Sequence, residues 1–196
     1  ALIEISKRAP RNEVARFILS DLDKAIEMMQ NIAPSGGKNR LSKDCAILLK
    51  SRVALYEGSW LKNFKGTAFV PNGPGWPGAN KDYNANYSFK SGSIEKESEF
   101  FFDEAIKAAQ IIAEKYNILT ANTGVFPQTS SEPENPYFSM FGNTDMSTFP
   151  DVLLWREYSK GLGVVNNVEV GIQHGNNGVG LTRSMVESFV MKDGKP

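Results

Sequence analysis

The stretch SKDCAILLKSRVALYEGSWLKNF, residues 42–64, decides the fold. Its apolar side chains recur every three or four residues, as they do on one face of an α-helix. That face comprises Ala46, Leu49, Val53, Tyr56, Trp60 and Phe64, and Leu48 and Leu55 widen the apolar arc. A helix with so broad an apolar surface has neighbours on more than one side, and Ala54 and Gly58 are small enough to let them approach closely. The stretch therefore predicts a long helix inside a stack of helices.

Two further stretches, one on each side of this helix, carry the same periodicity. In residues 13–32 the apolar stripe comprises Val14, Ile18, Leu22, Ala25, Met29 and Ile32, and Asn12 can cap the start. In residues 95–116 it comprises Phe101, Ala105, Ile112 and Tyr116. Segments 23–33 and 103–113 share six of eleven residues. Such recurrence is typical of tetratricopeptide-like helical hairpins, and chance similarity of two Ala-rich helices is the alternative.

Residues 65–93 interrupt the helical pattern, because Gly, Pro, Asn and aromatic residues replace the apolar repeat. Loops this long without secondary structure are usually functional or disordered. The five aromatic residues of this insertion, Phe69, Trp76, Tyr83, Tyr87 and Phe89, argue against disorder. We therefore expect an ordered loop that packs on the helices or faces a ligand.

The pattern changes again after about residue 120, where prolines and Gly/Asn-rich segments become frequent. Alternation over 152–158 predicts a short strand, and residues 183–191 predict a final helix. The predicted fold is mainly α, with tetratricopeptide-like hairpins, a long aromatic loop insertion and a loop-rich, short-strand C-terminal part. We place the helical scaffold in 1–119 and the loop-rich region in 120–196, as parts of one incomplete structural unit.

Composition excludes several classes of function. The 22 Lys and Arg balance the 22 Asp and Glu, so the basic excess that drives nonspecific nucleic-acid binding is missing. Cys45 is the only cysteine and His174 the only histidine, and neither has a metal-ligand partner at suitable spacing, so we predict no metal and no cofactor. No apolar run is long enough to span a bilayer.

Patterns that resemble catalytic motifs fail on their context. GPGWPG at 73–78 matches a dinucleotide fingerprint, but no strand precedes it, and Pro74 and Pro77 remove amides that would bind a pyrophosphate. Neighbouring acids, such as Asp21 with Asp23 or Glu132 with Glu134, fall on predicted helix faces or in a Pro-rich loop. We therefore predict no catalytic residue and no enzyme activity.

Four strings, in this order along the chain, resemble the SusD/RagB family. They are PRNEV with ILSDLDKAI at 10–14 and 18–26, RLSKDCA with LKSRVALYEG at 40–46 and 49–58, TRSMVESF at 182–189, and KDGKP at 192–196. Together with the aromatic insertion between the second and third helices, they cover essentially the whole chain. The resemblance implies a tetratricopeptide-like helical scaffold that carries a loop-rich ligand face.

The resemblance also implies a function and a location. Members of the family are surface-exposed outer-membrane lipoproteins of Bacteroidetes that bind glycans as nutrients and deliver them to a SusC-like TonB-dependent transporter, without catalysis. They are commonly longer than this chain and begin with a lipoprotein signal and an acylated cysteine. Cys45 lies inside a predicted helix and does not match that anchor. We therefore expect an internal fragment, whose membrane contact is made only through a lipid anchor outside this chain.

The insertion supplies the two kinds of group that hold a hydroxyl-rich ligand: aromatic faces for its C–H groups, and amides or carboxylates for its hydroxyls. The expected platforms are Trp76, Tyr83 and Tyr87, and the expected hydroxyl partners are Asn80, Asp82, Asn84 and Asn86. Two alternatives stay open: a helical-repeat scaffold that binds a protein or peptide, and, less favoured, a glycoside hydrolase.

Overall fold

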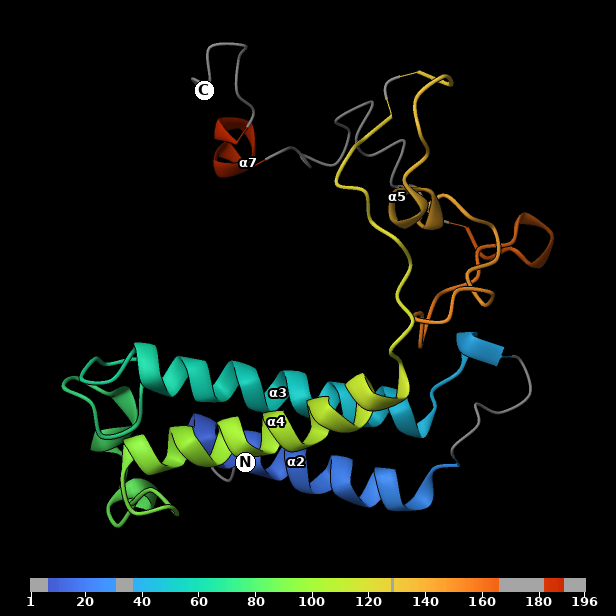
Figure 1. The fold of residues 1–196 in the computed structure, drawn as a ribbon. Helices are drawn as coiled ribbons and strands as arrows, with labels where there is room; N and C mark the ends of the chain where they lie inside the picture. Colours follow the sequence, from blue (N-terminus) through green and yellow to red (C-terminus); the bar gives the residue numbers. More distant parts are fainter. Residues whose placement is uncertain (1–6, 31–36, 128, 166–181, 189–196) are drawn as a thin grey trace. The chain divides into compact units, whose positions relative to one another are not determined.

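The computed structural model describes residues 7–30, 37–127, 129–165 and 182–188. The chain divides into two compact units, residues 1–155 and 156–196. The first unit contains the three long helices α2 (Arg11–Met28), α3 (Lys43–Asn63) and α4 (Ile94–Lys115), and the short helix α5 (Pro136–Met140). Short 3-10 turns η1 (Gly37–Asn39), η2 (Pro77–Asn80) and η3 (Asp82–Asn84) complete it. The prediction of a mainly α fold is confirmed (Figure 1).

The helix starts follow local capping chemistry. Ser42 precedes α3 and its hydroxyl oxygen accepts a hydrogen bond from the Cys45 amide, and Ser93 does the same for α4 through the Lys96 amide. Helix α2 starts differently, after Pro10 and without a side-chain cap. The predicted cap, Asn12, instead lies inside the helix, where it is buried.

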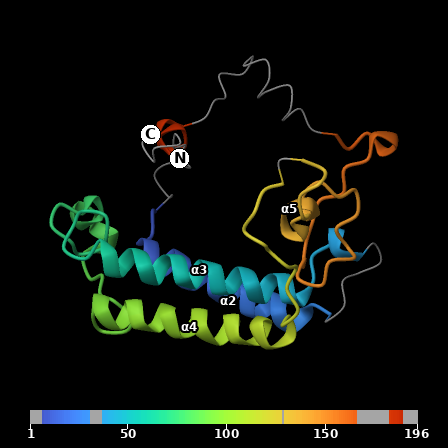
Figure 2. The ribbon, with the colours of Figure 1, turned by 45° about the horizontal axis from the view of Figure 1, so that its top comes forward.

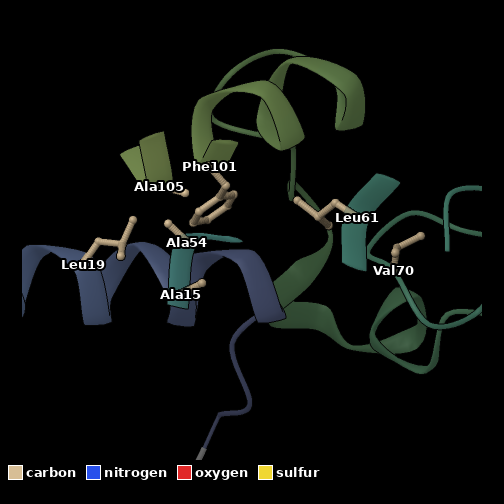
Figure 3. Packing of buried hydrophobic residues seen from close by; sticks show 7 residues of the cluster. All are labelled: Ala15, Leu19, Ala54, Leu61, Val70, Phe101 and Ala105. Carbon is tan, nitrogen blue, oxygen red and sulfur yellow. The ribbon is translucent and has the colours of Figure 1, made fainter. Parts of the chain in front are cut away.

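The three long helices pack side by side, with α3 in contact with both others, and α2 and α4 both run antiparallel to α3 (Figures 1 and 2). The main core forms where the three meet and continues into the insertion; it comprises Ala15, Leu19, Ala54, Leu61, Val70, Phe101 and Ala105 (Figure 3). Phe101 and Ala54 are completely buried. Beside them a side chain on Gly58 would lie 3.1 Å from the Phe102 ring, so α3 and α4 approach closely at that point.

Helix α2 buries a different face from the one that its apolar stripe predicts. The buried side chains are Asn12, Ala15 and Leu19, whereas Val14 is 43% exposed and Ile18 is 38% exposed. The reason is polar, because Asn12 and Arg16 on the buried side hydrogen-bond to Glu97 of α4. The helix is turned toward this carboxylate, and part of its apolar stripe faces outward.

Glu97 is completely buried and holds α2, α4 and the end of the insertion together. Its carboxylate accepts hydrogen bonds from Arg16 Nε at 2.7 Å and Arg16 Nη2 at 2.9 Å, from Asn12 Nδ2 at 3.0 Å and from the Ser91 amide at 3.0 Å. Burial alone would raise the pKa of Glu97, but the hydrogen bonds from Arg16, Asn12 and Ser91 outweigh it and lower the pKa to about 2. The carboxylate is therefore ionised and fully paired.

Lys50 and Asp44 of α3 form ion pairs with the neighbouring helices. Lys50 of α3 contacts Asp23 of α2 and Glu104 of α4, each at 2.7 Å, so one ammonium group links all three helices. At the other end of the stack, Asp44 accepts hydrogen bonds from Lys115 Nζ and the Tyr116 hydroxyl, both at 2.5 Å. These contacts fix the register of the helices along their length.

Residues 117–155 form an irregular segment held by side-chain hydrogen bonds. The Asp151 carboxylate accepts from the Thr120 amide at 2.9 Å and the Thr120 hydroxyl at 2.7 Å, and Asn135 caps α5. The Trp155 amide donates to the Lys38 carbonyl at 3.0 Å, which joins the segment to the helices. The strand predicted for 152–158 is not confirmed, since the described residues contain only one isolated bridge, between Ser159 and Val164.

In the second unit the structure describes the turn η4 (Lys160–Leu162) and the helix α7 (Arg183–Glu187). The Thr182 hydroxyl oxygen caps α7 by accepting a hydrogen bond from the Met185 amide at 3.2 Å. The predicted helix at 183–191 is thus present over its first five residues; His174 and the string at 192–196 lie outside the described residues. None of the helices described for this chain has the length and apolar composition of a membrane span.

Replacing Glu97 by Gln is expected to lower the free energy of unfolding by about 3 kcal/mol, because it leaves the Arg16 guanidinium without its counter-charge in a partly buried site. Urea unfolding followed by circular dichroism measures the change. The matched control is Glu99→Gln, at an exposed position two residues further along the same helix. It should change stability by no more than about 0.5 kcal/mol. Equal effects in the two variants would contradict the assigned role of Glu97.

The pH dependence of stability gives an independent test. A folded pKa of about 2, below the ordinary 4.5, stabilises the protein fully above pH 4.5, and this stabilisation is lost as the pH falls through 2. Between pH 6 and pH 3 the stability advantage of the wild type over Glu97→Gln should therefore shrink by roughly 2 kcal/mol. An advantage that stays constant over this range would show that the Glu97 pKa is not lowered.

Candidate functional site

The insertion between α3 and α4 is a series of tight turns, in which many backbone amides hydrogen-bond to carbonyls of the same insertion. Amides of residues 67, 70, 73, 76 and 79 each donate to the carbonyl three residues earlier, and η2 and η3 continue the pattern to Tyr87. Val70 and Pro71 are buried and anchor the first turns on the helices. The prediction of an irregular insertion at 65–93 agrees with this arrangement, and its order comes from repeated turns.

Two glycines have steric reasons to be glycine. A Cβ on Gly73 would lie 1.8 Å from the Thr67 carbonyl oxygen, so no other residue fits that turn without moving the backbone. A Cβ on Gly78 would lie 2.2 Å from the Trp76 ring, because the indole folds over this position. The Trp76 ring therefore packs directly on the backbone of Gly78.

Four of the five aromatic residues of the insertion belong to two groups of rings, and Tyr83 belongs to neither. Tyr56, Trp60, Phe64 and Phe69 contact one another in sequence, with centroid distances of 5.9, 4.3 and 5.6 Å, and the Trp60 indole nitrogen donates to the Phe69 carbonyl at 3.1 Å. This first group attaches the insertion to α3.

The second group is Trp76, Tyr87 and Phe89, with centroid distances of 5.6 and 5.5 Å. The Tyr87 hydroxyl donates to Asn12 Oδ1 at 2.7 Å, and Asn12 itself contacts Glu97. The second group is thereby connected to the buried carboxylate.

An open groove of about 980 Å³ runs between α2, α3 and the insertion, and we call it the α2–α3 groove. Its lining comprises Arg8, Ala9, Pro10, Arg11, Val14, Ala15, Ile18, Val53, Tyr56, Glu57, Ala68, Phe69, Trp76, Pro77, Gly78, Lys81, Tyr83 and Asn84. The volume is in the range of small-molecule and oligomer sites. The lining combines aromatic and aliphatic surface with a few charged groups.

The charged groups of the groove include one tight pair. Arg11 Nε and Nη2 donate to the two carboxylate oxygens of Glu57 at 3.0 and 2.7 Å, and the guanidinium also lies 4.2 Å from the Trp60 ring centroid. Glu57 is almost completely buried. This pair is therefore part of the groove wall and holds α2 against α3 at that end.

Three of the seven predicted ligand residues line the groove, namely Trp76, Tyr83 and Asn84. Trp76 is partly buried and Tyr83 is 41% exposed, so both rings offer surface to a ligand. Asn84 is buried, and its side-chain amide donates to the Gly78 carbonyl at 3.0 Å. This hydrogen bond holds the backbone on which the Trp76 ring packs.

The other four predicted residues lie outside the lining. Asn80, Asp82 and Asn86 are exposed on the outer side of the turns. Tyr87 is partly buried behind Trp76, and burial raises the pKa of its hydroxyl above the ordinary value. Within the structure as described, its contacts with Trp76 and Asn12 support the Trp76 platform from behind.

Several lining residues were not among the predicted ligand residues. Arg8 precedes α2 and Arg11 is its first residue, and Val14 and Ile18 belong to the stripe that the sequence pattern assigns to the core. Nothing in the periodicity distinguishes them, because an outward-facing apolar residue and a core residue give the same pattern. The only available signal was the clustering of Arg8 and Arg11 next to a Pro-initiated helix.

In the part of the chain that the structure describes, no group of three or more His, Cys, Asp or Glu side chains could hold a metal ion. Comparison of the chain with protein-family models, with curated proteins and with solved structures finds no match.

Gly78→Ala is expected to displace the Trp76 indole, because the new methyl group and the ring would occupy the same space. Iodide quenching of tryptophan fluorescence should increase in this variant, and the increase should vanish when Trp76 is also replaced by Phe. Ala79→Ser, at the exposed next position, is the control and should leave quenching unchanged. Unaltered quenching in Gly78→Ala would contradict the packing of the Trp76 ring on Gly78.

Proposed function

We propose that this protein captures oligo- or polysaccharide in the α2–α3 groove and does not cleave it. The observation that carries the proposal is that Trp76 and Tyr83, two aromatic residues of the insertion, line one open groove of about 980 Å³. Aromatic faces stack on the C–H faces of sugar rings, and an open groove admits an extended chain. Tyr56 and Phe69 add aromatic surface to the same wall.

The rigidity of the Trp76 platform supports this proposal. Its indole rests on Gly78 and packs against Tyr87 at a centroid distance of 5.6 Å, so little side-chain freedom is left to lose on binding. With about 1 kcal/mol for each stacking contact, two or three platforms plus hydrogen bonds give roughly 4 to 7 kcal/mol. This corresponds to dissociation constants from about millimolar to about ten micromolar, as suits a protein that must release its cargo.

The charges of the groove favour capture over cleavage. A glycoside hydrolase places two carboxyl groups about 5 to 10 Å apart around the scissile bond. Glu57 is the single carboxylate among the described lining residues, and both its oxygens accept hydrogen bonds from Arg11. A carboxylate held in this way stabilises the groove wall.

We also propose the finer features that the family resemblance implies. Helices α2 and α4 are both antiparallel to α3, and residues 23–28 of α2 begin the segment that is repeated at 103–113 in α4, which supports a tetratricopeptide-like hairpin arrangement. The proposed location is the outer membrane, reached through a lipid anchor outside this chain and facing the cell exterior. The proposed partner is a SusC-like TonB-dependent transporter that receives the bound glycan.

One observation favours a second candidate, a scaffold that binds a protein or peptide. Val14 and Ile18 of α2 and Tyr56 of α3 are 43%, 38% and 61% exposed along the groove. Apolar side chains at this spacing accept the apolar face of an amphipathic helix. A glycan microarray, with an assay for newly released reducing ends, separates the three candidates. Glycan binding without release supports capture, and release supports a hydrolase. An absence of both binding and release supports the scaffold.

Trp76→Ala should weaken binding of a glycan identified on the microarray at least about fivefold, because it removes one stacking platform while the helices keep their own core. Titration calorimetry measures the loss, and circular dichroism verifies that the variant is folded. Phe17→Ala is the matched control, since Phe17 is 64% exposed on α2 but does not line the groove. Undiminished binding by Trp76→Ala would reject the groove as the site.

A further inference from the structure

The α2–α3 groove is positively charged, although the chain as a whole is neutral. Its described lining contains three cationic side chains, Arg8, Arg11 and Lys81, and one acidic side chain, Glu57. The full sequence carries 22 basic and 22 acidic residues. The local excess therefore reflects the placement of these side chains rather than the composition.

Because Arg11 is paired with Glu57, the net positive charge of the groove comes from Arg8 and Lys81. Because Arg11 and Glu57 form a two-point ion pair, they neutralise each other. Arg8 and Lys81 are exposed, and they approach the groove from different elements: Arg8 precedes α2, and Lys81 links η2 to η3. A further ammonium group, that of Lys7, lies 6.0 Å from the centroid of the Tyr83 ring.

The cations stand next to the proposed stacking surfaces. Lys81 is two residues from Tyr83 and five from Trp76, and all three line the same groove. A sugar ring stacked on either aromatic side chain therefore has basic groups within the same groove, where an exocyclic carboxylate or sulfate can reach them. Charge-assisted hydrogen bonds to such groups are stronger than those to hydroxyls.

From this arrangement we infer that the ligand is an acidic saccharide, one whose sugar rings carry carboxylate or sulfate groups. The inference rests on the proposed function, because it assigns a substrate class to the proposed site. The aromatic side chains bind the ring faces, and Arg8 and Lys81 bind the anionic substituents.

The test compares acidic polysaccharides with neutral counterparts of the same backbone. Polygalacturonate, alginate and hyaluronan, each beside its carboxyl-reduced form, are titrated against the full chain by biolayer interferometry in 50 and 300 mM NaCl. We expect at least one acidic form to bind about tenfold or more tightly than its reduced form, with the difference falling at the higher salt concentration.

Variants assign the preference to the groove. Arg8→Gln combined with Lys81→Gln should reduce the tenfold preference to about twofold. Lys107→Gln removes an exposed cation from α4, outside the groove, and should keep the full preference. A double variant that retains the preference would overturn the inference.

The remaining outcomes separate this inference from the proposed function. Equal binding of acidic and reduced forms would overturn the inference and leave saccharide capture standing. No binding of any polysaccharide, here or on the microarray, would overturn both. Poly-L-glutamate bound as tightly as the best acidic polysaccharide would also overturn the inference, because recognition would then depend on charge without the sugar ring.

Discussion

The structure depends on one buried carboxylate. Glu97 is completely enclosed, and a group in that position is tolerable only because Arg16, Asn12 and the Ser91 amide supply hydrogen bonds to both of its oxygens. Meeting this requirement sets the rotation of α2 about its own axis. With Asn12 and Arg16 directed inward, Val14 and Ile18 are directed outward, where they form one wall of the α2–α3 groove. The groove is thus a consequence of how a buried charge is neutralised.

The same carboxylate is connected to the proposed binding surface through a short chain of contacts. Asn12 links Glu97 to the Tyr87 hydroxyl, and Tyr87 packs against Trp76. The polar interior therefore supports the aromatic platform directly, although the platform belongs to an insertion without regular secondary structure. Loops positioned by a rigid scaffold are common binding elements, and here the Asn12 side chain links the group around Trp76 to the buried carboxylate.

Much of the fold could be predicted from the sequence, because apolar periodicity and capping residues such as Ser42 identify the long helices. The site could be predicted only in part. Trp76 and Tyr83 stand out by residue type, but the inward or outward direction of Val14, Tyr87 and Asn84 depends on contacts between distant segments. Asn12 is the clearest case: its residue type suggests a helix cap, whereas its contact with a glutamate 85 positions later places it in the interior. Local patterns carry no information about such pairs.

The central claim, that Trp76 faces a saccharide while the other tryptophans do not, is tested most directly by NMR of the indole N–H groups. The chain has three tryptophans, and the indole nitrogen of Trp60 already donates to the Phe69 carbonyl. On titration with an oligosaccharide of the polysaccharide that binds most tightly, the account predicts a large, saturable shift of the Trp76 resonance and small shifts of those of Trp60 and Trp155. A Trp76 resonance that stays in place while another tryptophan resonance moves would contradict it.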